Sequence, residues 1–461
     1  MPKRINLTFK NKNGFFITNH NNKEIKLLIT PSLFSKVSDS ALEQLINSTN
    51  LPSVHSVIGL PDIHTGFGVP IGSVISSNYK NGFISSEAVG YDINCGVRLV
   101  KTNLFLKDLN KKDLESLSKN LSKLPLGLSN DGYKISKKDL DEILNKGINW
   151  AISKKLVSSK EKRSIEYNGY FKQADSSKIS KKAKDIAIKQ LGTLGQGNHF
   201  IDICIVSDIF DKNISKKWSL SKNQVCIFIH TGSRGLGYTV GKEYSSFFKN
   251  KNPICYEPFN TKLAKDYFKA MNACANYAFV NRAILTRSVF KVFKDTLNLG
   301  QKELSFDLVY DLVHNLATIE KIDSKKVIVH RKGATRAFLP SDLNKSSRYL
   351  ETGAPILLPG SMLDYSYILL PTKNIKQTLN TMPHGCGRLV SRSVAKNLMS
   401  FKDLKEYMSK NKIILSGRSE NTAREENPNA YKKSSLVVKS LESKRLVKKI
   451  ARIKPIIVLT G

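Results

Sequence analysis

Hydrophobic residues follow two spacings along the chain, and each spacing predicts a different kind of element. Short apolar runs rich in β-branched residues are typical of buried strands. Such runs occupy residues 97–102, 198–206, 224–230, 326–330, 355–358 and 454–461. Spaced apolar positions among lysines, as in "KDLNKKDLESLSKNLSKL", predict amphipathic helices within 105–190. We also expect a long helix from Thr261 to Phe293 and a further helix over 307–322.

The order of these elements bears on the fold class. Strands and helices alternate without an internal repeat and without a clean linker, and 40% of the residues are hydrophobic, as in ordinary globular proteins. We therefore predict an α+β fold, with mixed β-sheets in a single large domain over residues 1–461. Residues 105–190 are interpreted as a basic helical insertion in that domain.

The net charge of the chain limits the classes of binding partner to be expected. The 461 residues contain 74 lysines and arginines against 38 acidic residues, a formal net charge of +36. Such a field attracts polyanions such as RNA, DNA or an anionic membrane. A compositionally biased genome explains the excess equally well, because most of it is lysine accompanied by many asparagines. Neither a membrane-spanning stretch nor a signal peptide is found in the sequence, so we expect a cytoplasmic protein away from membranes.

Several candidate metal ligands stand at predicted strand ends. His230 in "HTGSRGLG" and His330 in "HRKGATR" each end an apolar run, His199 opens another, and Asp92 and Cys95 occupy a turn before a strand. This mixture of carboxylate, imidazole and thiolate suits manganese, zinc or cobalt better than magnesium or calcium. Five donors exceed the three that a catalytic zinc takes from protein. Two ions bridged by the thiolate would use all five and could clamp a phosphoryl displacement.

A plainer interpretation is that Cys95 is a small buried hydrophobic residue and that each histidine binds a backbone carbonyl. Nearby arginines favour the metal site, because guanidinium groups recognise phosphate esters. They are Arg98, Arg234, Arg331 and Arg336.

His384 is a histidine of a different kind. In "MPHGCGRLVSR" it is followed by Gly385, Gly387 and Arg388. Glycines allow a phosphate to approach the backbone, and the arginine can hold it. A neutral imidazole in this place could attack a nucleotide phosphorus and store the nucleotidyl group. A sixth metal ligand or a turn residue is an equally good interpretation.

Six motifs, in this order, resemble the RtcB family of RNA ligases: "GYDINCGVR", "GQGNHF", "HTGSRGLG", "HRKGATRAF", "LLPGSM" and "MPHGCGRLVSR". "LPDIHTGFGVPIG" and "NPNAYK" add to the resemblance, which runs from about residue 50 to the end of the chain. It implies ligation of RNA ending in a 2′,3′-cyclic phosphate or 3′-phosphate to RNA with a 5′-hydroxyl, with GTP and two manganese ions (Mn2+). An archease-like activator is a candidate partner, and we expect a monomer.

The resemblance also implies roles for single residues. Asp92, Cys95 and His199 would hold one manganese, and Cys95, His230 and His330 the other. His384 would carry GMP, and Arg234 would meet the RNA terminus. The nucleotide would be bound by Asn198, Asp202, Ser361, Ser366, His384, Gly385, Gly387, Arg388, Tyr431 and Thr460.

Three positions depart from the family pattern. Thr460 stands where the family usually has a lysine near the guanine, Asp202 where it has a glutamate, and Cys386 where it has an alanine. We therefore expect weaker guanine selectivity. Asp62 and His64 could assist proton transfer, although a turn-stabilising role suits the aspartate better. The rival functions are a metal-dependent RNA phosphodiesterase or phosphatase without nucleotidyl transfer, and a non-catalytic RNA-binding protein.

Overall fold

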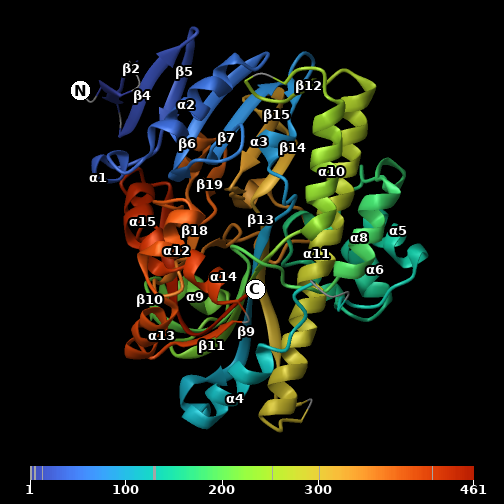
Figure 1. The fold of residues 1–461 in the computed structure, drawn as a ribbon, viewed down its shortest axis with the longest axis vertical. Helices are drawn as coiled ribbons and strands as arrows, with labels where there is room; N and C mark the ends of the chain where they lie inside the picture. Colours follow the sequence, from blue (N-terminus) through green and yellow to red (C-terminus); the bar gives the residue numbers. More distant parts are fainter. Residues whose placement is uncertain are drawn as a thin grey trace.

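The fold is α+β, as predicted, and contains two mixed sheets (Figure 1). The structure is a computed structural model that describes residues 3–4, 7–12, 14–127, 131–251, 253–300, 302–417 and 419–461. The sheet nearer the N-terminus and the sheet that contains the C-terminal strand lie one above the other in Figure 1. The C-terminus is central in the view of Figure 1, and Gly461 there leaves no room for a Cβ beside the backbone of Gly195.

The first sheet has the strand order β13-β9-β11-β10-β21-β18-β17, with β20 also paired to β21. Its neighbours are antiparallel except for the parallel pair β20 and β21. Five of the six strands predicted from apolar runs lie in this sheet and are confirmed, with most of their apolar residues buried. The sixth, over 326–330, is confirmed as part of β15 in the second sheet. The bounds are β9 Gly96–Phe105, β10 Phe200–Ile209, β11 Gln224–Thr231, β13 Phe306–Val313, β17 Ile356–Leu358, β18 Ser366–Pro371, β20 Ile414–Gly417 and β21 Val447–Thr460.

The second sheet has the order β14-β15-β7-β6-β5-β4-β3 and combines antiparallel pairs with the parallel pair β5 and β6. Its bounds are β3 Lys10–Lys12, β4 Phe15–His20, β5 Lys23–Leu27, β6 Val54–His64, β7 Ile71–Asn78, β14 Asn315–Ile322 and β15 Lys325–Lys332. Short two-stranded sheets are formed by β1 (Lys3–Arg4) with β2 (Leu7–Thr8), by β8 (Phe83–Ile84) with β12 (Glu257–Pro258), and by β16 (Ala334–Arg336) with β19 (Thr381–Pro383).

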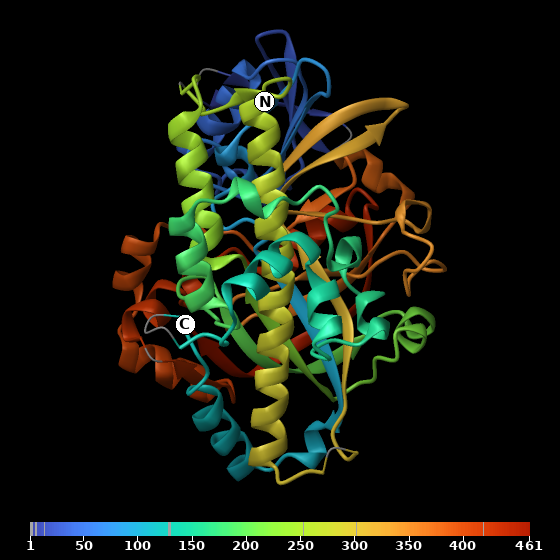
Figure 2. The same ribbon diagram turned by 90° about the vertical axis from the view of Figure 1, so that its right-hand side faces the viewer.

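A long helix, α11 (Lys262–Thr296), runs the length of the molecule (Figure 2). It confirms the helix predicted over this stretch. Thr261 caps it, accepting a hydrogen bond from the backbone of Ala264, and its alanines let neighbouring elements pack closely. Figure 1 shows α10 (Arg234–Phe247) alongside it.

The predicted helices of residues 105–190 are confirmed, and several of them pack against α11 (Figure 2). They are α4 Lys111–Leu121, α5 Lys137–Lys146, α6 Ile148–Ser153, α7 Ser159–Lys162 and α8 Lys181–Gln190. Residues 128–130 of this stretch lie outside the described residues. The remaining α-helices are α1 Pro31–Phe34, α2 Asp39–Asn47, α3 Ser86–Val89, α9 Lys212–Lys217, α12 Arg392–Leu398, α13 Phe401–Lys410, α14 Glu420–Glu425 and α15 Ser434–Glu442. No helix in the described ranges combines the length and the hydropathy that crossing a membrane requires.

The helix predicted over 307–322 is wrong. This stretch forms β13 at the edge of the first sheet and β14 at the edge of the second, and His314 is the residue between them. Its apolar residues fit a helical spacing as well as a strand, and tertiary packing decides between the two. The chain therefore passes from one sheet to the other at His314.

Candidate active site

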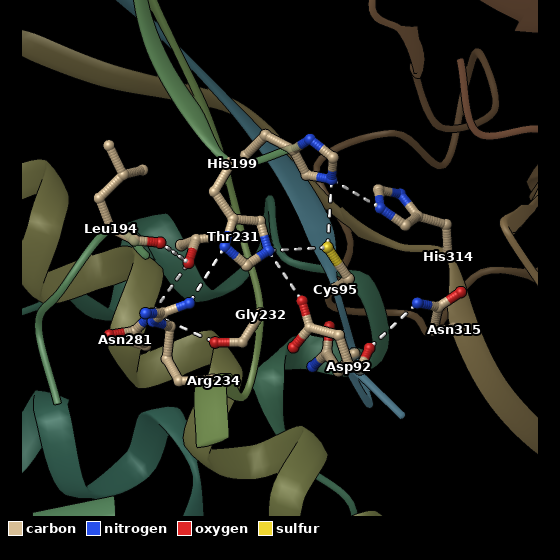
Figure 3. A network of polar contacts seen from close by, with 12 residues as sticks. Asp92, Cys95, Leu194, His199, Thr231, Gly232, Arg234, Asn281, His314 and Asn315 are labelled. Atoms are coloured by element: carbon tan, nitrogen blue, oxygen red, sulfur yellow. Dashed lines mark hydrogen bonds and ion pairs between the residues drawn. The ribbon is translucent and has the colours of Figure 1, made fainter. Parts of the chain in front are cut away.

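The sulfur of Cys95 lies at the centre of a cluster of ligand-type side chains (Figure 3). Its Sγ is 3.1 Å from Nε2 of His230 and 3.5 Å from Nε2 of His199. The same His199 nitrogen is 2.8 Å from Oδ2 of Asp92, and the His230 nitrogen is 3.0 Å from Nε2 of His314. Two three-residue groups, Asp92–Cys95–His199 and Cys95–His230–His314, thus share one sulfur atom.

The strand order of the first sheet brings these residues together. Cys95 precedes β9, His199 precedes β10, His230 is near the end of β11, and His314 follows β13. These four strands are neighbours and antiparallel, so the start of one lies beside the end of the next. The backbone of His314 also donates to the carbonyl of Cys95 at 2.9 Å, which fixes the turn between the sheets.

Burial sets the protonation of the cluster. It lowers the pKa of His230 and of His314 well below the ordinary value for histidine, so both rings are neutral. Burial, and next the Asp92 carboxylate, raise the pKa of the Cys95 thiol well above its ordinary value. Burial also tends to raise the pKa of Asp92, but the hydrogen bond from His199 and the charge of Arg234 lower it further than burial raises it.

The cluster fits divalent metal ions. Ligands of a tetrahedral ion at about 2.1 Å lie roughly 3.4 Å from one another, and the sulfur-to-nitrogen distances at Cys95 are of this size. Oδ1 of Asp92 is buried and has no hydrogen-bond partner among the described residues, although a buried carboxylate oxygen normally has one. Thiolate, imidazole and carboxylate together favour a borderline ion.

His330 does not belong to this cluster, which corrects the ligand set expected from the sequence. It lies within β15, where its Nε2 accepts a hydrogen bond from the backbone of Ser85 at 3.3 Å. Its ring stacks on Phe83 at a centroid distance of 4.7 Å. Burial lowers its pKa to about 3. His314 takes the place in the second group that the sequence interpretation gave to His330.

His384 is held by a buried aspartate. It directly follows β19, and its Nδ1 lies 2.6 Å from Oδ2 of Asp62, which also accepts the backbone N–H of His384 at 3.1 Å. Asp62 is fully buried in β6. The carbonyls on either side of it, of Pro61 and Ile63, accept hydrogen bonds from the buried Lys432. Because the carboxylate accepts the Nδ1 proton, Nε2 of His384 keeps a free lone pair.

His384 stands between two cavities. One, of about 430 Å³, is lined by the Cys95 cluster. The other, of about 640 Å³, is lined by Asn198, His384, Gly385, Gly387, Arg388 and Tyr431, among others. Gly387 has a φ of +70°, and a Cβ there would lie 2.0 Å from the carbonyl oxygen of Asp62, so only glycine fits. The ring of His384 is 5.2 Å from that of His314, and His384 lines both cavities.

The family model described as tRNA-splicing ligase RtcB matches residues 44–461. The chain belongs to the RtcB family. A tRNA-splicing ligase RtcB of Pyrobaculum aerophilum is 38% identical over 444 residues, 92% of each chain. One of Methanococcus maripaludis is 36% identical over 446 residues, 93% of each chain. The RNA-splicing ligase RtcB homolog 1 of Entamoeba dispar is 35% identical over 459 residues, 95% of this chain and 86% of that protein.

Five of the ten residues that the resemblance to RtcB assigns to the nucleotide lie together. Asn198, Asp202, Ser361, Tyr431 and Thr460 line one small pocket that adjoins the larger cavity. Register explains part of this arrangement, because Phe200 on β10 pairs with Thr460 on β21 and Asp202 follows two residues later on β10. The pocket is therefore built on the central strands of the first sheet.

Two residues of the expected RtcB nucleotide site have structural partners. Oγ of Ser366 accepts a hydrogen bond from the backbone of Gly360 at 2.9 Å and so supports the turn that presents Ser361. Arg388 lines the larger cavity, but its guanidinium already contacts Tyr431 at 2.8 Å and Glu426 at 3.2 Å. Both residues thus shape the site, and Arg388 keeps the tyrosine in place.

The pocket contains buried polar atoms without partners among the described residues: Oδ1 of Asp202, Oγ1 of Thr460 and Oε1 of Glu426. Burial raises the pKa of Asp202 well above its ordinary value. Unpaired buried polar atoms are unfavourable unless a ligand supplies the missing hydrogen bonds. This pocket therefore suits the polar edge of a nucleobase.

The arginines singled out in the sequence have partners within the protein. Arg234 lines the cavity of the Cys95 cluster, but its Nη1 is 3.1 Å from Nδ1 of His199 and its Nη2 donates to the carbonyl of Leu126. It therefore supports a member of the cluster. Arg98 and Arg331 are buried against carboxylates, Asp311 and Glu161 for the first and Glu320 for the second, so the expectation that they bind phosphate is wrong. Arg336 also lies beside Glu320 but is partly exposed and lines a separate cavity, so its phosphate contact stays a prediction.

Sequence reasoning missed two residues of this site, His314 and Arg392, and one contact, between Asp62 and His384. His314 was hidden by the wrong helix over 307–322. Arg392 lines both cavities and stands four residues after Arg388, in the last position of "MPHGCGRLVSR". The tie between Asp62 and His384 spans 322 positions of the sequence, and no local spacing reveals it.

Proposed function

We propose that the protein joins RNA ends, using GTP and two manganese ions, through a GMP adduct on His384. The strands joined would end in a 2′,3′-cyclic phosphate or 3′-phosphate on one side and a 5′-hydroxyl on the other. Membership of the RtcB family supports the reaction class, and the names of the relatives support RNA splicing, above all of tRNA, as its setting.

The pair formed by His384 and Asp62 is the observation that carries the proposal. A histidine whose Nδ1 proton is held by a buried carboxylate presents its Nε2 lone pair in one direction. That ring borders a cavity large enough for a nucleotide, and a pocket with unpaired polar atoms adjoins this cavity. The arrangement suits a nucleophile that attacks a nucleoside triphosphate.

The ions would be held by the two groups that share Cys95, with Asp92 and His199 on one side and His230 and His314 on the other. When bound, divalent ions neutralise the charge of reacting phosphates. Arg234 keeps the His199 ring in place through its contact at Nδ1.

In the first step, Nε2 of His384 bonds to the α-phosphorus of GTP, and the bond to pyrophosphate breaks. Asp62 retains the proton on Nδ1 throughout and stabilises the cationic ring of the adduct. A 3′-phosphate oxygen of RNA then bonds to the same phosphorus as the bond to histidine breaks. Finally the 5′-hydroxyl oxygen attacks the RNA phosphate, and GMP leaves. A cyclic end must first be opened by water.

Incubation with GTP and manganese followed by mass spectrometry tests this proposal. We expect the intact protein to gain the mass of one GMP residue and His384→Ala to gain none while it retains its metal. A GMP adduct on His384→Ala would contradict the assignment. A wild-type protein that opens cyclic phosphates but never forms the adduct would instead be the phosphodiesterase.

A further inference from the structure

A group of exposed aromatic side chains stands beside the cavity of the Cys95 cluster. Phe67 is 58% exposed and Tyr238 is 55% exposed, and the half-buried Tyr91 lies between them with ring centroids 5.9 Å and 5.7 Å away. The Nζ of Lys242 lies 4.9 Å from the rings of Phe67 and Tyr91 and 5.9 Å from that of Tyr238. We call these four residues the aromatic cluster. Large exposed rings gathered in one place commonly mark a binding surface.

The aromatic cluster is continuous with the site. Phe67 and Tyr91 line the same cavity as Asp92, Cys95 and His384. Tyr238 and Lys242 lie about one and two turns along α10 from Arg234, which lines this cavity too. A polymer whose end reaches His384 from this side must therefore pass the aromatic cluster.

Phe67 is displayed by a rigid loop. A Cβ on Gly66 would lie 2.4 Å from the carbonyl oxygen of Val69, and a Cβ on Gly68 would lie 2.0 Å from Oε2 of Glu87, so the flanking glycines pack tightly. The buried Lys332 donates to the carbonyls of Phe67 and Val69, each at 2.7 Å. The loop is thus fixed from beneath while the ring between the glycines faces outward.

We propose that the aromatic cluster binds single-stranded RNA next to the reacting end, with bases stacked on Phe67 and Tyr238 and a backbone phosphate near Lys242. This deepens the proposed function and rests on it. Aromatic faces accept any base, and a lysine beside them supplies the charge that a strand requires. A protein partner is the less favoured occupant, because this strongly basic chain places a cation among the rings.

Binding of short fluorescent RNA strands to the full-length protein with manganese, and without GTP, tests the inference. Phe67→Ala and Tyr238→Ala should each weaken binding roughly tenfold, as loss of one stacked base predicts. Lys242→Gln should flatten the dependence of log affinity on log salt by about 0.7, the value for one phosphate of a single strand. Phe247→Ala is the matched control, because Phe247 is 61% exposed at the far end of α10 and should bind as wild type does.

Three further arms make the result decisive. Strands with a 3′-phosphate and strands with a 5′-hydroxyl are measured separately, and the one that loses affinity identifies the RNA end on the cluster. A strand that lacks the base expected to stack on Phe67 should bind the wild type more weakly than the complete strand does. Its affinity should be the same for Phe67→Ala as for the wild type. GMP adduct formation should be unchanged in all these variants, because they alter only RNA binding. Absence of the adduct in the wild type would refute the proposed function and would leave the RNA-binding result for the aromatic cluster to be judged by itself. Unchanged RNA affinity in both aromatic variants would overturn the inference and leave a protein partner as the occupant.

Discussion

The two sides of His384 differ in how their polar atoms are satisfied. On one side, the ligand-type atoms around Cys95 lie within 3.5 Å of one another in a chain of contacts. On the other, Asp202, Thr460 and Glu426 each present a buried atom with no partner among the described residues. Crowded donors suit a small cation, whereas separate unpaired atoms suit a larger ligand with hydrogen-bonding groups of its own.

This contrast suggests that different residues carry out the reaction and select the nucleotide. Asp202 and Thr460, the positions expected to depart from the family pattern, line the small pocket, and neither belongs to the ligand groups around Cys95. We therefore expect changes around Cys95 to abolish the reaction and changes around Thr460 to alter only which nucleotide is used.

Cys95→Ala should have the largest effect, because it removes the atom that the two groups share. We expect both manganese ions and all RNA joining to be lost. Metal content after dialysis, measured together with joining, checks this. Cys226→Ala is the control, since Cys226 is equally buried in β11 but outside the cluster, and it should retain both ions. Full manganese content in Cys95→Ala would refute the shared site.

His314→Ala and His330→Ala together test which histidine is the metal ligand: His314, as the structure indicates, or His330, as the sequence motif suggested. His314→Ala should lose one of two ions and its joining activity. His330→Ala should keep both ions and lose about 1–3 kcal/mol of unfolding free energy, since it leaves a hole beside Phe83. Metal content and denaturant unfolding check the two variants. The reverse result, with metal lost only in His330→Ala, would restore the ligand set expected from the sequence.

Much of the fold could be predicted from the sequence, for physical reasons that particular elements show. The apolar runs of β10, β11 and β21 are buried on both faces, and α11 lacks internal proline and glycine, so each has one favoured conformation. The apolar residues of 307–322 fit the spacing of a helix and that of a strand. Only the packing of this stretch at the edges of two sheets makes it a pair of strands. His314 was therefore missed as a metal ligand. The sequence interpretation assigned that role to His330, because His330 ends an apolar run and precedes a basic loop with a glycine, as His230 does.

Asp62→Asn should slow adduct formation by about 10²–10⁴-fold while leaving the metal bound. An asparagine that donates to Nδ1 of His384 would move the ring proton to Nε2 and block the lone pair there. Single-turnover mass spectrometry with GTP measures the rate. Glu166→Gln is the control, because Glu166 is also a buried carboxyl but accepts from the backbone of Val313. An unchanged rate would show that Asp62 only stabilises the turn.

Thr460→Lys should have the smallest effect, on the choice of base alone. Thr460 and Asp202 lie diagonally on neighbouring strands of the pocket, and burial raises the pKa of Asp202, so its protonated carboxyl can bind guanine or adenine. A lysine would favour the ionised carboxylate, which accepts the N–H groups of guanine, and would itself donate to the guanine carbonyl. Adenine carries an amino group at that position and would be rejected.

We expect Thr460→Lys to raise the ratio of adduct formation with GTP to that with ATP by roughly tenfold, with Thr460→Ser as a control that leaves it unchanged. A strong GTP preference in the wild type that the lysine does not increase would show that Asp202 and its neighbours select guanine without a cation.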